Sequence, residues 1–171
     1  YYDYDSSAMD KSTSRASENS NIKELYANDY AFAALTWDNE VITWGNSTEF
    51  QNNGGAPYYK EKNTGNWISI KNELSSGVNE IVSNPGSFMA IKNDKIVVWG
   101  SEYSGGNPYI QTDSTPVDAK MNYSGLTSSN VIPNKTGYAI LQNGSVNFIG
   151  SNLKLEGSGY QTSAINNVLD V

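Results

Sequence analysis

The segment AFAALTWDNEVITWG, residues 31–45, contains the pattern that decides the fold. It joins an aromatic-led apolar run to a second, β-branched run that ends in Trp-Gly, and Asp38-Asn39 lies between them. Aromatic and β-branched residues fit pleated strands. Asn tolerates positive φ, so it suits a tight turn between strands. The segment therefore predicts an antiparallel β-hairpin in which residues 31–35 pair with residues 41–44.

The same pattern occurs twice more along the chain. The second copy is IVSNPGSFMAIKNDKIVVWG (81–100), and the third is VIPNKTGYAILQNGSVNFIG (131–150). A period near 50 residues is typical of solenoids, propellers and repeat arrays. The copies match at an aromatic position, at the residue before the last glycine, and at that glycine: Phe32, Phe88 and Tyr138; Trp44, Trp99 and Ile149; Gly45, Gly100 and Gly150.

Each of the later copies also predicts a hairpin. Residues 88–91 are expected to pair with 96–99 across Asn93-Asp94, and residues 138–141 with 146–149 across Asn143-Gly144. The first copy has one more residue between its aromatic and its Trp than the others. This extra residue near Thr36-Trp37 predicts either a bulge or a longer turn.

The repeats set the predicted organisation of the chain. Residues 1–20 are polar and predict a tail or linker, whereas 21–171 form the β-repeat domain. Polar, Gly-rich loops follow each hairpin and lead to weaker strands at 67–70, 116–121 and 162–165. The expected units are residues 22–77, 78–127 and 128–167, with the start of a further unit at 168–171. The predicted fold class is all-β, built from antiparallel hairpin repeats of about 50 residues.

These residues resemble the repeats of the regulator-of-chromosome-condensation family. The similarity is greatest to a bacterial variant with "AFAAL…TWG" repeats, here Ala31-Phe32-Ala33-Ala34-Leu35 and Thr43-Trp44-Gly45. It covers residues 21–171, about three repeats, and implies propeller-like blades. It also implies a large bacterial protein at the cell surface or outside the cell. The ring is incomplete in three blades, which leaves three alternatives: a fragment, an assembly of copies, or a compact three-fold barrel.

Composition excludes several kinds of chemistry. The 171 residues contain no Cys and no His, which removes thiolate metal sites, Cys nucleophiles and Ser-His-Asp catalysis. The net charge of −7 and the single Arg15, in the polar tail, argue against a nucleic-acid partner. No apolar stretch approaches the roughly 20 residues that a membrane-spanning helix needs.

Aromatic residues in or beside the loops are the candidate binding residues. Tyr and Trp combine a large contact area with a polar group, so they suit protein interfaces and sugar stacking. The alternative is that they pack between repeats, as we expect of the recurring Trp44 and Trp99. The candidates are Trp37, Tyr58, Tyr59, Trp67, Tyr103, Tyr109 and Tyr160.

Acidic residues offer two weaker hypotheses. Calcium would need carboxylates and loop carbonyls, for which Asp113 with Asp118, or residues 1–5, are mild hints. A glycan hydrolase would need two carboxylates across a cleft, and the nearest pairs include Asp38 with Glu40. In both cases we prefer the interpretation that these are ordinary acidic residues in contact with solvent. We therefore expect no catalytic residue, no metal and no cofactor.

The sequence favours a non-catalytic binding or assembly module. Its expected partner is a protein or a glycan, or further copies of itself. One alternative is a structural subunit that forms a fibre or ring through open strand edges. The other is a carboxylate-dependent glycan hydrolase, which the sequence does not favour.

Overall fold

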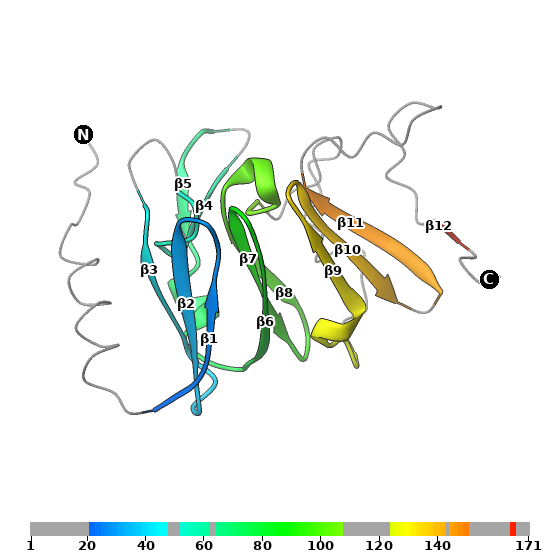
Figure 1. Ribbon diagram of the computed structural model, residues 1–171, viewed down its shortest axis with the longest axis horizontal. Coiled ribbons are helices and arrows are strands. Elements are labelled where there is room, and N and C mark those ends of the chain that lie inside the picture. Colours follow the sequence, from blue (N-terminus) through cyan, green and yellow to red (C-terminus); the bar gives the residue numbers. More distant parts are fainter. Residues whose placement is uncertain are drawn as a thin grey trace.

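The fold is known from a computed structural model that describes residues 21–47, 52–61, 64–107, 124–142 and 144–150, with the short strand at 165–166. Within these residues the chain is all-β and forms small antiparallel sheets. Figure 1 shows three of these sheets standing side by side in the order of the sequence. The predicted fold class is confirmed.

Each of the three sheets contains one predicted hairpin and the strand that precedes it. We call them units 1, 2 and 3. Unit 1 contains β1 (Ile22–Ala27), β2 (Ala31–Thr36) and β3 (Val41–Gly45). Unit 2 contains β6 (Val78–Asn84), β7 (Ser87–Lys92) and β8 (Ile96–Gly100). Unit 3 contains β9 (Val131–Asn134), β10 (Gly137–Gln142), β11 (Ser145–Gly150) and, beside β11, β12 (Ile165–Asn166).

The strand register repeats from one unit to the next. The recurring positions face each other as Phe32 and Trp44, as Phe88 and Trp99, and as Tyr138 and Ile149. The first strands also correspond, since β1 and β6 both have a register shift near their start. The three predicted hairpins are therefore confirmed, with their predicted pairing.

The turns explain the extra residue of the first copy. In unit 2 the backbone N–H of Lys92 donates to the carbonyl of Lys95, which closes a two-residue turn. In unit 1 the N–H of Thr36 donates to the carbonyl of Glu40, and Asn39 takes a φ of 62° within the loop. An Asn in this left-handed conformation is typical of longer hairpin turns. The extra residue thus lengthens the turn to three residues, 37–39, between Thr36 and Glu40.

The last glycine of each hairpin is required by a close backbone approach. Gly45 and Gly100 have φ values of 118° and 112°, which side chains rarely adopt. A Cβ on Gly100 would lie 2.7 Å from the carbonyl oxygen of Gly86, and one on Gly45 would lie 2.8 Å from that of Tyr30. The recurring glycine thus lets the end of the third strand lie against the turn that joins the first and second strands of its unit.

The segment between units 1 and 2 forms a small layer of its own. β4 (Tyr58–Lys60) pairs with β5 (Trp67–Ser69), and the single helical turn α2 (Lys71–Leu74) follows. The weaker strand predicted at 67–70 therefore pairs with β4 and does not join the sheet of unit 1. The weaker strand predicted at 116–121 lies outside the described residues. Of the one predicted at 162–165, only Ile165 is described, in β12.

Two hydrophobic cores lie between the units. One joins unit 1 to unit 2 and includes Ile70 and Leu74 from the linking segment. The other joins unit 2 to unit 3. Successive residues of β7 face opposite ways, with Phe88 and Ala90 in the first core and Met89 and Ile91 in the second, as the period-2 geometry of a strand requires. The units therefore stack face to face, and the described strands do not form a closed barrel.

Among the residues that the structure describes, the helical elements are α2 and two 3-10 turns, η1 (Glu102–Ser104) and η3 (Ser128–Asn130). None of the helices in the described ranges has the length and apolar character that crossing a membrane demands.

The boundaries predicted for the polar tail and the repeat units stay predictions.

Candidate functional site

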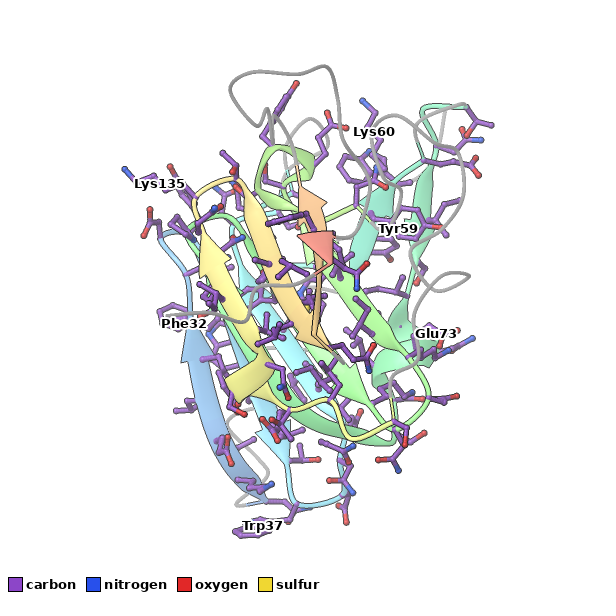
Figure 2. All side chains as sticks on the ribbon, turned by 90° about the vertical axis from the view of Figure 1, so that its right-hand side faces the viewer. Phe32, Trp37, Tyr59, Lys60, Glu73 and Lys135 are labelled. Atoms are coloured by element: carbon purple, nitrogen blue, oxygen red, sulfur yellow. The ribbon has the colours of Figure 1, made fainter. Side chains whose placement is uncertain are left out.

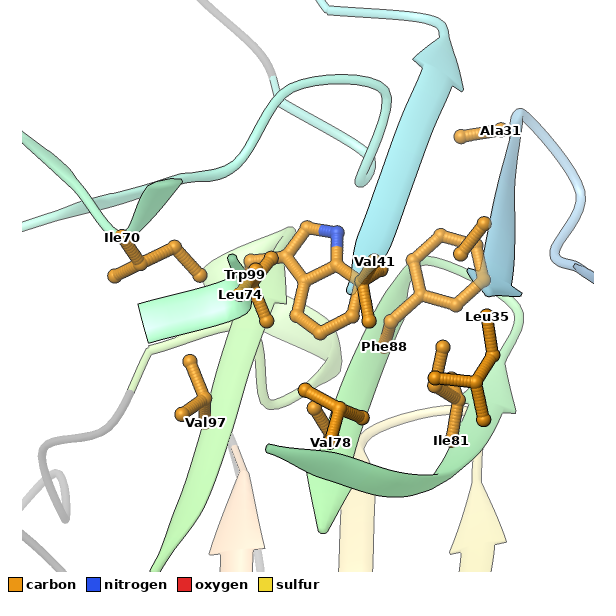
Figure 3. Close-up of a cluster of buried hydrophobic side chains, with 12 residues drawn as sticks. Ala31, Leu35, Val41, Ile70, Leu74, Val78, Ile81, Phe88, Val97 and Trp99 are labelled. Carbon is orange, nitrogen blue, oxygen red and sulfur yellow. The ribbon is translucent and has the colours of Figure 1, made fainter. Parts of the chain in front are cut away.

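The faces on which the units meet have the most specific geometry in the structure. In unit 2 the rings of Phe88 and Trp99 stack with centroids 5.3 Å apart and planes 24° apart. Both side chains are fully buried. They belong to the same cluster as Leu35 and Val41 of unit 1, and Figure 3 shows the two rings beside these residues. An aromatic pair on one unit thus packs against small and aliphatic residues on the unit before it.

A Gly-Gly loop closes this interface. The indole Nε1–H of Trp99 donates to the carbonyl oxygen of Gly54 at 3.1 Å. A Cβ on Gly54 would lie 2.6 Å from two ring atoms of Phe88, so only glycine fits against that ring. A Cβ on Gly55 would lie 2.5 Å from the backbone of Gly45. The first glycine therefore contacts the next unit, and the second contacts the hairpin of its own unit.

The loop after unit 2 repeats this arrangement. A Cβ on Gly105 would lie 3.0 Å from Gly137 and 3.2 Å from the ring of Tyr138 in unit 3. A Cβ on Gly106 would lie 2.4 Å from the backbone of Gly100. Two successive interfaces thus use the same pair of glycines for the same two contacts.

A buried hydroxyl pair adds a polar link between units 2 and 3. The hydroxyl of Tyr138 is hydrogen-bonded to Ser87 Oγ at 2.9 Å, and both side chains are buried. Ser87 Oγ also donates to the carbonyl of Ser104 at 2.5 Å. Burial raises the pKa of the Tyr138 hydroxyl above its ordinary value, and the bond to Ser87 offsets part of that rise. The group is therefore held neutral and works as a structural hydrogen-bonding partner.

An asparagine precedes the second strand of every unit. Asn28 Oδ1 accepts from the N–H groups of Tyr30 and Ala31, and Asn84 Oδ1 accepts from those of Gly86 and Ser87. Asn134 Oδ1 accepts from the N–H of Thr136. These are Asx turns, in which the side chain replaces a backbone acceptor.

The amide nitrogens of two of these asparagines hold the Gly-Gly loops. Asn28 Nδ2 donates to the carbonyl of Asn53 at 2.8 Å, and Asn84 Nδ2 donates to that of Ser104 at 2.6 Å. Both acceptors immediately precede the Gly-Gly pair of their loop. One side chain therefore fixes both the turn of its hairpin and the loop that covers the following unit.

The corresponding aromatic pair of unit 1 is exposed. Phe32 and Trp44 stack with centroids 5.6 Å apart and planes 17° apart, much as Phe88 and Trp99 do. Phe32 is 48% exposed, Trp44 is partly exposed, and Leu25 on the neighbouring strand is 68% exposed. Their counterparts Phe88, Trp99 and Ile81 are buried. Ala34 and Ile42, which share this face, are themselves buried. We call Leu25, Phe32 and Trp44 the open face of unit 1.

Unit 3 has the opposite face uncovered. Ile132 is 67% exposed and Leu141 is 45% exposed. By register they correspond to Val82 and Ile91 of unit 2, which are buried against unit 3. We call Ile132 and Leu141 the open face of unit 3. The described stack therefore shows one side of an inter-unit interface at one end and the other side at the other end.

The predicted surface aromatics lie in different places. Trp37 is 65% exposed at the β2–β3 turn, with Lys23 Nζ 5.9 Å from its ring centroid. Figure 2 shows it at the end of the molecule opposite Tyr59 and Lys60. Tyr58 is half-buried in β4, and Tyr59 packs against the first core. Tyr103 is 69% exposed in η1. Tyr109 and Tyr160 lie outside the described residues.

Trp67 lies on the same side of the molecule as Tyr59 and Lys60. It is 36% exposed, and Lys60 Nζ lies 5.9 Å from its ring centroid. Asn107 Nδ2 donates to the carbonyl of Lys60 at 2.7 Å, which ties the loop after unit 2 to β4. This side combines aromatic, amide and cationic groups.

The acidic residues form no metal-binding group within the part of the chain that the structure describes. Asp38 and Glu40 both lie in the β2–β3 turn region, and the Asp38 carboxylate accepts a hydrogen bond from Asn21 Nδ2. Asp113, Asp118 and residues 1–5 lie outside the described residues. The calcium hypothesis for them stays a hypothesis.

Sequence reasoning missed the asparagines and the Gly-Gly pairs as interface residues. The asparagines carried a usable signal, because Asn28, Asn84 and Asn134 have the same spacing as the recurring aromatics. The glycine pairs did not, because Gly54 follows Gly45 by nine residues whereas Gly105 follows Gly100 by five. The loops differ in length, so only the fold shows that the pairs are equivalent.

Comparisons with known proteins concern the fold. No protein-family model matches the chain, and no curated protein matches it. The crystal structure of Kap60 bound to yeast RCC1 (Prp20) contains a similar chain, with 19% sequence identity and a TM-score of 0.46. The match covers 75% of this chain and 29% of that one, so the chain spans less than a third of the protein that it resembles.

Proposed function

We propose that the chain is a non-catalytic repeat module that binds other proteins by adding them to its stack of units. The observation that carries the proposal is the open face of unit 1. There Phe32 is exposed and Trp44 is partly exposed, although the equivalent Phe88–Trp99 stack is buried under a neighbouring unit. An exposed apolar face that repeats a buried one is a site for another protein surface. That surface would resemble the face of the unit that covers the buried copy.

Two further features bear on the partner and the location. The net charge of −7 disfavours a polyanionic partner. The resemblance of the repeats to those of bacterial surface proteins supports a location outside the cell or on its surface.

A photo-crosslinking experiment tests the proposal in the cell that makes the protein. The photoreactive amino acid p-benzoylphenylalanine is placed at position 32 in one variant and at position 37 in a control. Trp37 is also aromatic and exposed but lies outside the open face. We expect position 32 to crosslink to a peptide that mass spectrometry identifies, and position 37 to give much less product. The proposal would be contradicted if position 32 gave no crosslinked product, or no more product than position 37.

A glycan is the second candidate ligand, because Trp67 and Tyr103 are exposed and Lys60 lies beside Trp67. Aromatic faces with nearby polar groups suit sugar stacking. A glycan array compares the unchanged protein with Trp67→Ala, and Trp37→Ala serves as the control. Binding that Trp67→Ala removes and Trp37→Ala keeps supports this candidate, whereas an array without a signal, or a signal unchanged by Trp67→Ala, counts against it. A turnover assay on any bound glycan checks that the module is non-catalytic.

A further inference from the structure

The two interfaces inside the chain have the same polarity. At the first, the buried pair Phe88 and Trp99 of unit 2 meets Leu35 of unit 1. At the second, Tyr138 and Ile149 of unit 3 meet Ile91 of unit 2. In both cases the recurring aromatic position of the later unit packs on aliphatic residues of the earlier one. The structure thus contains two examples of a single, directional way of packing.

The ends of the described stack show the two sides of this interface separately. Unit 1 exposes the side that carries the aromatic pair, through Leu25, Phe32 and Trp44. Unit 3 exposes the aliphatic side, through Ile132 and Leu141. The residues corresponding to Ile132 and Leu141 in unit 2, Val82 and Ile91, are those that receive unit 3. The two open faces are therefore of opposite kinds. The open face of unit 1 corresponds to the face by which unit 2 packs on unit 1, and the open face of unit 3 corresponds to the face by which unit 2 receives unit 3.

We propose that the open face of unit 1 binds the open face of unit 3 of a second copy of this chain, head to tail. This proposal rests on the proposed function and names the partner for that site. Continuity with the two internal interfaces argues for this occupant, because a second copy in this orientation continues the stack with the same polarity. Pairing two copies of unit 1 would place one Phe–Trp stack against another, which neither internal interface does.

A contact of this kind uses two different surfaces of each copy. Such heterologous contacts lead to a ring when the rotation closes and to an open series of copies when it does not. The arrangement differs from pairing at strand edges, because side chains of the sheet faces, and not backbone hydrogen bonds, make the contact. A substitution that disrupts one open face therefore prevents a further copy from binding at that face, whereas the other open face of the same copy can still bind.

Complementation between two variants tests this geometry. Phe32→Asp places a charge on the open face of unit 1, and Ile132→Asp places one on the open face of unit 3. Both positions are exposed, so the fold should survive, as far-UV circular dichroism and a thermal melt will show. Trp37→Asp, at an exposed position outside both faces, is the matched control. Mass is measured by light scattering after size-exclusion chromatography over a concentration series.

We expect the unchanged protein and Trp37→Asp to assemble as concentration rises. Each face variant alone should stay monomeric, whereas their mixture should form a one-to-one dimer and stop. An Ile132→Asp protein that still dimerises, or a mixture that stays monomeric, would overturn the head-to-tail contact. So would an unchanged protein that is monomeric at every concentration. Crosslinking from position 32 to a different protein would keep the proposed function and remove only this partner.

Discussion

The indole N–H of Trp99 donates a hydrogen bond to the carbonyl oxygen of Gly54, 3.1 Å away and 45 residues earlier in the chain. This bond joins unit 2 to the loop that leaves unit 1. Trp44 holds the same register position in unit 1, but it is partly exposed. Two residues that the sequence makes equivalent therefore have different environments, and this difference is measurable.

Trp99→Ala should destabilise the protein far more than Trp44→Ala. Trp99 is fully buried, and its removal leaves a cavity and breaks the bond to Gly54, which should cost about 3–5 kcal/mol in the free energy of unfolding. Trp44 is partly exposed, so its loss should cost less than about 2 kcal/mol. Urea denaturation of both variants measures the difference. Equal losses would show that the face of unit 1 is covered as fully as that of unit 2.

Gly54→Ala should be more harmful than Gly65→Ala. Both glycines have positive φ, of 99° and 71°, so alanine is strained at each by about 1–2 kcal/mol. At Gly54 the new Cβ also meets the Phe88 ring at 2.6 Å, whereas no atom lies within 4 Å at Gly65. Overpacking should add roughly 1–3 kcal/mol at Gly54. Thermal unfolding gives the comparison, and similar melting temperatures for the two variants would contradict the close contact with Phe88.

Asn84→Ala should cost more stability than Asn134→Ala. Asn84 is buried, and alanine leaves the buried N–H groups of Gly86 and Ser87 without their acceptor, at about 1–3 kcal/mol for each. Asn134 is exposed, so water can replace its oxygen and the loss should stay below about 1 kcal/mol. Urea denaturation measures both, and equal losses for the two variants would contradict the buried role of Asn84.

Alkaline pH should weaken the contact between units 2 and 3 through Tyr138. Burial raises the pKa of its hydroxyl in the folded protein, whereas the unfolded chain loses this proton near pH 10. Above about pH 10 the unfolded state therefore binds fewer protons than the folded state, and the free energy of unfolding falls as pH rises. Below that pH the contribution is fully present.

Tyr138→Phe isolates this effect. The variant should lose about 0.5–1.5 kcal/mol at neutral pH, because the hydrogen bond to Ser87 is gone. Its stability should then fall less steeply than that of the unchanged protein above about pH 10. Urea denaturation at neutral pH and at higher pH values gives both slopes. Parallel curves for the two proteins would exclude a raised pKa at Tyr138.

The hairpins could be predicted from the sequence because their signals are local. Alternating side chains, Asn-containing turns and the last glycine act within a few residues, so the register of Phe88 with Trp99 follows from them. Exposure could not be predicted in this way. Phe32 and Phe88 hold the same position in the repeat, and the neighbouring unit makes one of them buried whereas the other is exposed.

The candidate site was harder to predict because it consists of contacts between units. Gly54 is recognisable as a flexible residue, but its role depends on the Phe88 ring, which comes from the next repeat. The sequence allows Tyr59 to be either a surface residue or a packing residue, and in the structure it packs against the core between units 1 and 2. Such distinctions depend on residues far apart in the sequence.

The amide side chains that hold the turns and loops have a consequence for the conditions that the protein tolerates. Asn28 and Asn84 act through neutral hydrogen bonds, and dissolved ions screen such bonds far less than interactions between exposed charges. The ion pair of Lys95 with Glu73 lies at the surface, where such pairs contribute little. A stack held in this way should lose little stability as the ionic strength of the solution rises.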